Sequence, residues 1–232
     1  MRALALLFAL LSAPAWAAMT PPVRMKFVDF ETNAPVEGAV VLFHGTAREG
    51  TVTGRGGKLA TLFLVEAVTD ANGEVRIPAQ EFSANPFQVG VNHEAPLMMV
   101  LHSGYRLELL RNSRRSAPDA AQDLTQWDYN GQTRQLRRWA GEAELRQIVA
   151  SVDLYLKAML GAPCDWQRIP RTLVMTERIA NDWERMRVAG TDPALRGQRP
   201  IITPLSAILR NESFYQQQGC GSPRAFFAPY LR

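Results

Sequence analysis

Residues 35–45 read PVEGAVVLFHG and residues 61–78 read TLFLVEAVTDANGEVRIP, with a glycine-rich interval between them. Both runs are rich in β-branched and aromatic residues, which favour β-strands. The tetrapeptide DANG at Asp70–Gly73 lies inside the second run, and an Asn-Gly pair can adopt the positive φ angles of a tight hairpin turn. This stretch therefore predicts a β-sheet unit, with a strand on either side of the turn.

The neighbouring sequence extends this unit to about seven short strands. Val23–Phe30 alternates apolar and polar residues, and Pro35 follows it as a residue that cannot donate to a sheet. The other expected strands are Gly38–Gly45, Leu59–Val68, Glu74–Pro78, Phe87–Val91, Leu97–Leu101 and Tyr105–Leu110. Short strands at such close spacing predict a β-sandwich over residues 18–111.

Three short motifs stand at turns of this region: PVEGAVV at Pro35–Val41, TDANGE at Thr69–Glu74 and SGY at Ser103–Tyr105. Together they resemble the carboxypeptidase regulatory-like domain, which belongs to the prealbumin-like (transthyretin-like) sandwiches. The resemblance covers about residues 23–111 and implies a Greek-key fold. It also implies an exported, mostly non-catalytic module that packs beside a catalytic domain, binds a partner or acts as a spacer. It brings no catalytic residues with it.

The sequence changes character after residue 111. Residues 112–141 contain few aliphatic side chains and predict a linker, so we expect few contacts across it and a sandwich that folds without the rest. In residues 142–232 apolar residues recur at helical spacing, which predicts an α-helical region. Three helices are expected, at Glu142–Leu160, Arg171–Val188 and Pro204 to about Gln218. The predicted fold class is therefore α+β.

The N-terminus has the pattern of a secretory signal peptide. Arg2 precedes the apolar run Ala3–Leu11, and Ala15 and Ala17 place small side chains where signal peptidase requires them. Cleavage between Ala17 and Ala18 would remove residues 1–17 and deliver the chain to the periplasm or the medium. The apolar run is too short to span a bilayer, so the processed chain is not expected to span a membrane.

The charge of the chain bears on its partners. The formal net charge is +4, a mild excess that does not predict nucleic acid as a partner. Two arginine clusters, Arg111–Arg115 and Arg134–Arg138, could meet an anionic surface, but aspartates between them favour a solvated linker. We expect the partner to be a protein or a cell-envelope component.

The chain has two cysteines, Cys164 and Cys220, and each follows an expected helix. Disulfides persist in exported compartments, so the pair predicts a bridge between the C-terminal tail and the helices. The alternatives are two buried free thiols, or a catalytic cysteine that acts with His93 or His102.

The three histidines, His44, His93 and His102, all fall in the β region and are the candidate ligands for zinc or copper. None forms a close pair in sequence, so no metal site and no cofactor is predicted. His93-Glu94 lacks the second histidine of the metalloprotease motif, because Leu97 stands at that position. Motifs of serine hydrolases, of P-loops and of dinucleotide binding are absent as well, and no catalytic residue is predicted.

Three hypotheses for function follow. The leading one is an exported, non-enzymatic binding or structural module. The first alternative is a periplasmic hydrolase, or an accessory subunit of one, with its site at the junction of sandwich and helices. The second is a metal-handling protein that uses the histidines. A deep polar cleft at the junction would favour the hydrolase.

Overall fold

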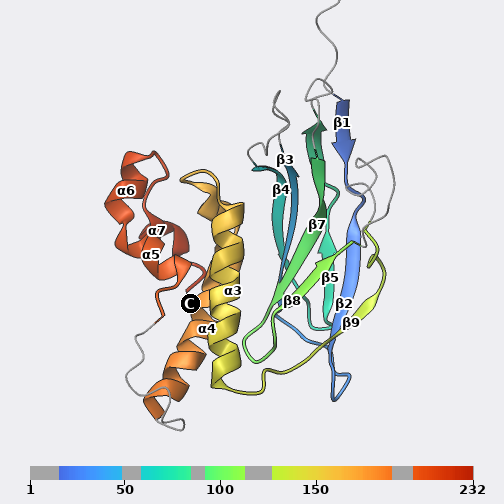
Figure 1. Cartoon of the computed structure of the whole chain (residues 1–232), viewed down its shortest axis with the longest axis vertical. Coiled ribbons are helices and arrows are strands. Elements are labelled where there is room, and N and C mark those ends of the chain that lie inside the picture. Colours follow the sequence, from blue (N-terminus) through green and yellow to red (C-terminus); the bar gives the residue numbers. More distant parts are fainter. Residues whose placement is uncertain (1–15, 49–58, 85–91, 113–126, 190–200, 232) are drawn as a thin grey trace, which may run out of the picture.

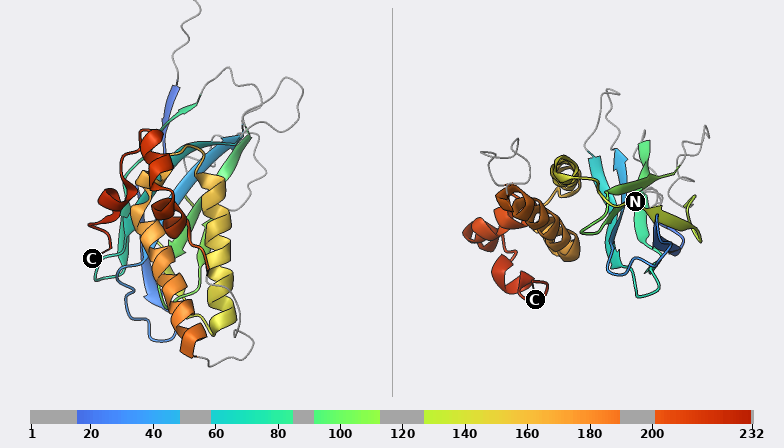
Figure 2. Two further views of the ribbon diagram at one scale, coloured as in Figure 1. Left: turned by 90° about the vertical axis from the view of Figure 1, so that its left-hand side faces the viewer. Right: turned by 90° about the horizontal axis from the view of Figure 1, so that it is seen from below.

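The computed structural model describes residues 16–48, 59–84, 92–112, 127–189 and 201–231. Within them the chain forms three layers: a three-stranded sheet, a four-stranded sheet and a layer of helices (Figure 1). Viewed along the sheets, the helices lie on one side of all the strands (Figure 2, right). The predicted α+β class and the pair of facing sheets are confirmed.

Two main sheets and one small ribbon account for the described strands. The four-stranded sheet is antiparallel, in the order β4 (Leu59–Val68), β3 (Val40–Arg48), β7 (Asn92–Leu101) and β8 (Glu108–Arg111). The three-stranded sheet has the order β5 (Glu74–Ile77), β2 (Val23–Asp29) and β9 (Thr133–Leu136), and β9 runs parallel to β2. The ribbon pairs β1 (Trp16–Met19) with β6 (Glu81–Ala84).

The predicted signal peptide and one expected strand fall partly or wholly outside the described residues. β1 crosses the predicted cleavage site, with Ala17 opposite Ser83 and Ala18 opposite Phe82. The rest of the predicted signal peptide and the expected strand Phe87–Val91 lie outside the described residues.

Alternation along β3 explains why there are three layers. Val41 and Phe43 face the space between the two sheets, whereas Val40 and Leu42 face the helices, and all four are buried. Successive side chains of a strand point to opposite faces, so a run of four successive apolar residues in a strand must be covered on both sides. In β7 the sheet-facing residues are Met98 and Val100, and the helix-facing residues are Leu97, Met99 and Leu101.

Residues 127–138 pair and pack with the sandwich, which corrects this part of the linker predicted over 112–141, whereas residues 113–126 lie outside the described residues. Trp127 is buried between the sheets, with its ring centroid 5.1 Å from that of Phe43. β9 pairs with β2 and buries Leu136. Only one of its four residues, TRQL, is apolar, so its sequence carried no strand signal. This strand is stabilised by its backbone pairing with β2 and not by apolar side chains of its own.

The DANG turn connects the two sheets, which corrects the expected hairpin. The strands on either side were predicted, but β4 pairs with β3 and β5 pairs with β2. Asp70 Oδ1 accepts hydrogen bonds from the N–H groups of Asn72 and Glu74, both at 2.9 Å. Gly73 has a φ of 73°, and a Cβ there would lie 2.3 Å from the carbonyl oxygen of Phe27. Only glycine fits this position.

The C-terminal region is helical, as expected, but has more elements than the three predicted. The long helices α3 (Glu142–Met159) and α4 (Pro170–Ala189) end within one residue of their predicted bounds. The third expected helix divides at Asn211, whose backbone N–H is shared at 3.2 Å between the carbonyls of Ala207 and Ile208 and whose side-chain amide also donates to Ala207 at 2.9 Å. The additional elements are α5 (Pro204–Arg210), α6 (Glu212–Gln217), α7 (Pro223–Phe227) and the 3₁₀ helix η1 (Asp165–Arg168). None of the described helices is long and apolar enough to cross a membrane.

The predicted disulfide is confirmed. Cys164 and Cys220 are bonded, with their Cα atoms 5.3 Å apart, although 56 positions separate them in the chain. The Gln167 side-chain amide donates to the carbonyl of Cys220 at 2.6 Å beside the bridge. Both thiols are consumed, so the alternative of a catalytic cysteine is excluded.

Glu66 of β4 fastens the helical layer to the central sheet by capping α4. The residue before Pro170 is Ile169, whose side chain cannot accept a hydrogen bond. The Glu66 carboxylate accepts instead, from the N–H of Arg171 at 2.9 Å, and from the N–H and the hydroxyl of Thr172, both at 3.0 Å. A carboxylate is favourable at the partly positive N-terminus of a helix. Burial raises the pKa of Glu66, and these hydrogen bonds oppose the rise.

A fragment of residues 18–112 should not fold cooperatively, contrary to the expectation from sequence. The fragment would lack Trp127 and β9. It would also expose the six buried sandwich side chains that pack against the helices, which are Val40, Leu42, Leu64, Leu97, Met99 and Leu101. Exposing those six side chains costs about 10 kcal/mol, as much as the whole stability of many domains. Circular dichroism melts of the fragment and the full chain test this, and a cooperative melt of the fragment would contradict it.

Replacing Glu66 should loosen α4 from the sheet. We expect Glu66→Leu to lower the free energy of unfolding by about 2 kcal/mol and Glu66→Gln, which keeps one acceptor oxygen, by about 1 kcal/mol. Urea unfolding measures both, with Glu74→Gln as the matched control because its side chain is 44% exposed on β5. Equal losses in Glu66→Gln and the control would show that the cap contributes nothing.

Candidate functional site

The two main sheets meet along a seam between their edge strands β8 and β9. At one end of the seam the Arg106 N–H donates to the carbonyl of Arg137 at 2.8 Å. At the other end the Tyr129 hydroxyl donates to the carbonyl of Arg111 at 3.2 Å. Between these points, in the part of the chain that the structure describes, β8 pairs only with β7 and β9 only with β2. The seam is therefore closed at its ends and bordered by two free strand edges.

A cleft of about 560 Å³ opens at this seam, and we call it the arginine cleft. Its lining comes from β2 and the turn after it, from β8 and the residues before it, and from β9 and the residues after it. The lining residues are Val28, Phe30, Asn33, Arg106, Glu108, Thr133, Arg134, Gln135 and Arg137. Three arginines against one glutamate make the cleft cationic.

The three arginines are held in different ways. Arg134 pairs with Glu108 at 3.1 Å, and its Nε has no hydrogen-bond partner among the described residues. Arg106 pairs with Glu144 of α3 at 2.8 Å. The guanidinium of Arg137 lies 3.8 Å from the centre of the Phe30 ring, and no described carboxylate lies within ion-pair distance of it. Arg137 is thus an oriented cation with free donors.

From sequence, the cluster Arg134–Arg138 is expected in a solvated linker, whereas the structure places Arg134 and Arg137 in the lining of the cleft. The signal was the spacing of Arg134, Arg137 and Arg138 after the tryptophan at 127. The sequence did not indicate that β9 would bring two of these residues beside Arg106 of another segment. Of the other cluster, Arg111 ends β8, and Arg114 and Arg115 lie outside the described residues.

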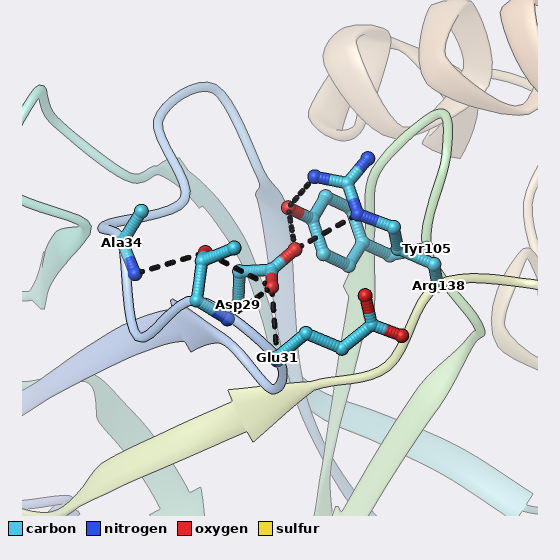
Figure 3. Close-up of polar contacts among 6 residues, drawn as sticks. Asp29, Glu31, Ala34, Tyr105 and Arg138 are labelled. Carbon is cyan, nitrogen blue, oxygen red and sulfur yellow. Dashed lines mark hydrogen bonds and ion pairs between the residues drawn. The ribbon is translucent and has the colours of Figure 1, made fainter.

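A buried carboxylate holds the segments that carry the cleft. Asp29 is 2% exposed and stands between the cleft residues 28 and 30. Its Oδ1 accepts from the N–H groups of Glu31 and Thr32 at 3.0 Å and from the Thr32 hydroxyl at 3.1 Å. Its Oδ2 accepts from the Tyr105 hydroxyl at 2.8 Å and from Nε of Arg138 at 3.0 Å (Figure 3). Three separate segments therefore converge on one side chain.

These bonds set the ionisation of the group. The hydrogen bond from the Thr32 backbone, followed by that from the Tyr105 hydroxyl, holds the pKa of Asp29 well below its ordinary value. Burial, together with the bond to Asp29, raises the pKa of Tyr105, which stays protonated. Both oxygens of Asp29 are engaged, so the network positions the neighbouring residues Arg106 and Arg137 and presents no free base.

The structure does not gather the histidines. His44 is buried, with Nε2 3.4 Å from the Thr61 hydroxyl. His102 lies in the turn after β7, where its ring meets the Tyr105 ring edge-on and burial lowers its pKa. His93 lies on β7, and its side chain is outside the described residues. Across the described ranges no three potential metal ligands form a cluster.

Two other hollows lie on the helical side of the protein. One, of about 510 Å³, lies at the junction of sandwich and helices, where the hydrolase alternative places its site. Its lining contains Ser103 but no imidazole or thiol, and its Asp182 is bonded to Arg185. The other, of about 540 Å³, is an apolar hollow over Trp166 between α3, α5 and α6. Neither combines unpaired charge with free backbone edges as the arginine cleft does.

Asp29 should make the stability of the fold depend on acid pH. Because its pKa is lowered in the folded state, its ionised form stabilises the protein above the unfolded value of about 3.9, and that stabilisation is lost as pH falls further. Asp29→Asn should therefore lower the melting temperature strongly at pH 7, with a difference from wild type that shrinks towards pH 2. Asp153→Asn on α3 is the control. A difference that stays constant with pH would refute this role.

No protein-family model matches the chain, and no curated protein matches its sequence. The resemblance of the three turn motifs to the carboxypeptidase regulatory-like domain therefore stays an expectation from sequence. The function of the arginine cleft has to be argued from its own geometry.

Proposed function

We propose that this chain is an exported binding module whose arginine cleft holds a carboxylate-bearing partner. Arg137 carries the proposal, because its guanidinium lies 3.8 Å from the Phe30 ring centre and is left without a described ion pair. A side chain already held in place loses little conformational entropy when it binds. The planar guanidinium also matches a carboxylate with two parallel hydrogen bonds.

The chemistry of the cleft supports binding rather than catalysis. Asp29 is saturated with donors, and Glu108 is paired with Arg134. Tyr105, with its raised pKa, is a poor base or nucleophile at neutral pH. The cleft offers fixed cations and no reactive group, which is the composition of a recognition site.

The wider setting of the proposal comes from the sequence. We infer a Greek-key sandwich of the carboxypeptidase regulatory-like type, exported to the periplasm or secreted after cleavage between Ala17 and Ala18. The glycines of the three motifs support the resemblance, since Gly38, Gly73 and Gly104 all have positive φ. The Cys164–Cys220 disulfide suits an oxidising compartment. The partner would be a protein or a cell-envelope component that carries acidic groups.

Removing the charge of Arg137 should weaken binding of an acidic probe. We expect Arg137→Gln to lower the affinity for a fluorescent hexaglutamate peptide about tenfold, the effect of losing one charge-assisted hydrogen-bond pair. Fluorescence anisotropy at low and high salt measures this, and the wild-type affinity should fall with salt. Arg134→Gln should weaken binding less than Arg137→Gln, because the Arg134 guanidinium is already paired with Glu108 and its Nε is buried.

Arg76→Gln is the matched control, because it removes the same charge from a β5 side chain that is 69% exposed outside the cleft. An equal loss of affinity in the control would show that net charge alone attracts the peptide. Competition with inorganic triphosphate tests whether the cleft binds carboxylate groups or phosphate groups. If triphosphate displaces the labelled peptide at a lower concentration than unlabelled hexaglutamate does, the cleft prefers phosphate to carboxylate and the proposed ligand class is wrong.

A further inference from the structure

The backbone of β9 presents to the arginine cleft hydrogen-bonding groups that no other described residue uses. Lys26 donates its N–H to the carbonyl of Gln132, and Phe30 donates to that of Leu136, at 3.0 and 2.9 Å. In a parallel ladder the residues that bond to the neighbour alternate with residues whose N–H and C=O point the other way. The residues that point away from β2 are therefore Thr133 and Gln135, and both line the cleft.

The charge along this edge limits what can pair with it. A free strand edge is a template for another strand, and proteins control this risk with short strands and charged side chains. β9 is four residues long, and Arg134 lies between its two outward-facing residues while Arg137 follows them. Two copies of this edge would bring like charges together, whereas an acidic strand would be attracted. The edge thus selects against self-pairing and in favour of an acidic partner.

We infer that the occupant of the arginine cleft is an extended segment of a partner protein with acidic residues at alternate positions, which adds to the edge of β9. This inference rests on the proposed function. Side chains of a paired strand alternate between its two faces, so carboxylates at every second position would all lie on the side that carries Arg137. Main-chain bonds to Thr133 and Gln135 would supply affinity, and the arginines would select the sequence.

Peptide chemistry can test the backbone bonds separately from the charges. The probe is acetyl-(Glu-Thr)₃-amide, titrated into the full chain and followed by fluorescence anisotropy of a labelled copy. Two N-methylated versions keep every charge and side chain, and they block the amide donors at the glutamates or at the threonines. We expect one version to bind about tenfold more weakly and the other to bind like the parent, because a strand shows alternate donors to each side.

A protein variant provides the matching test. Gln135→Pro removes an N–H that points away from β2, so the β2–β9 ladder keeps its bonds, and proline is tolerated at such edge positions. Gln135→Pro should lower the affinity for the parent peptide about as much as the N-methylation that weakens binding does. Hydrogen exchange of the wild-type chain supplies an independent readout, since the peptide should slow the amides of Thr133 and Gln135.

The outcomes separate the two proposals. If both N-methylated peptides bind like the parent while Arg137→Gln still weakens binding, the cleft binds carboxylates without strand addition, and this inference is overturned. If the parent peptide binds wild type and Arg137→Gln equally, the proposed function itself fails. Slowed exchange at Thr133 and Gln135, together with sensitivity to only one N-methylation register, would establish strand addition.

Discussion

The four-stranded sheet must be covered on both faces, and the rest of the structure depends on that constraint. Its central strands place apolar side chains alternately towards the small sheet and towards the helices, as Phe43 and Leu42 do on β3. Neither neighbouring layer is an optional addition, because removing either would expose half of the apolar runs at 40–43 of β3 and 97–101 of β7. The contacts that fasten the helices, Glu66 on the N-terminus of α4 and the disulfide of the C-terminal tail, serve this requirement.

The same constraint explains where a site can form. The side chains on both faces of the central sheet are buried in packing contacts, so polar groups that bind a ligand must lie at the edges of the sheets. The seam between β8 and β9 is such an edge, and its β9 side is polar because only Leu136 packs into the interior. A strand held by backbone pairing to β2, rather than by its own burial, leaves Thr133 and Gln135 available to a ligand.

Local sequence patterns predicted the features that depend on neighbouring residues alone. The helical stripe after residue 142, the strand alternation in Val23–Asp29 and the glycine of the DANG turn all follow from spacing and backbone freedom. Pairing between distant segments did not follow from spacing. The DANG turn predicts a hairpin from sequence, because the sequence does not show which sheet each strand joins. β9 was missed because its stability comes from a neighbour more than a hundred positions away, and with it the arginine cleft was missed.

Two adjacent arginines show how one extended segment can serve both the fold and a ligand. Neighbouring residues of an extended chain point to opposite sides, so Arg138 reaches the buried Asp29 while Arg137 lies over Phe30 at the cleft. The ion pair with Asp29 neutralises Arg138 and holds the segment in place beside Tyr105. Because the backbone is held on that side, the guanidinium of Arg137 is fixed without an anion of its own among the described residues. The fold thereby positions an unneutralised cation at the surface, which is what recognition of a carboxylate requires.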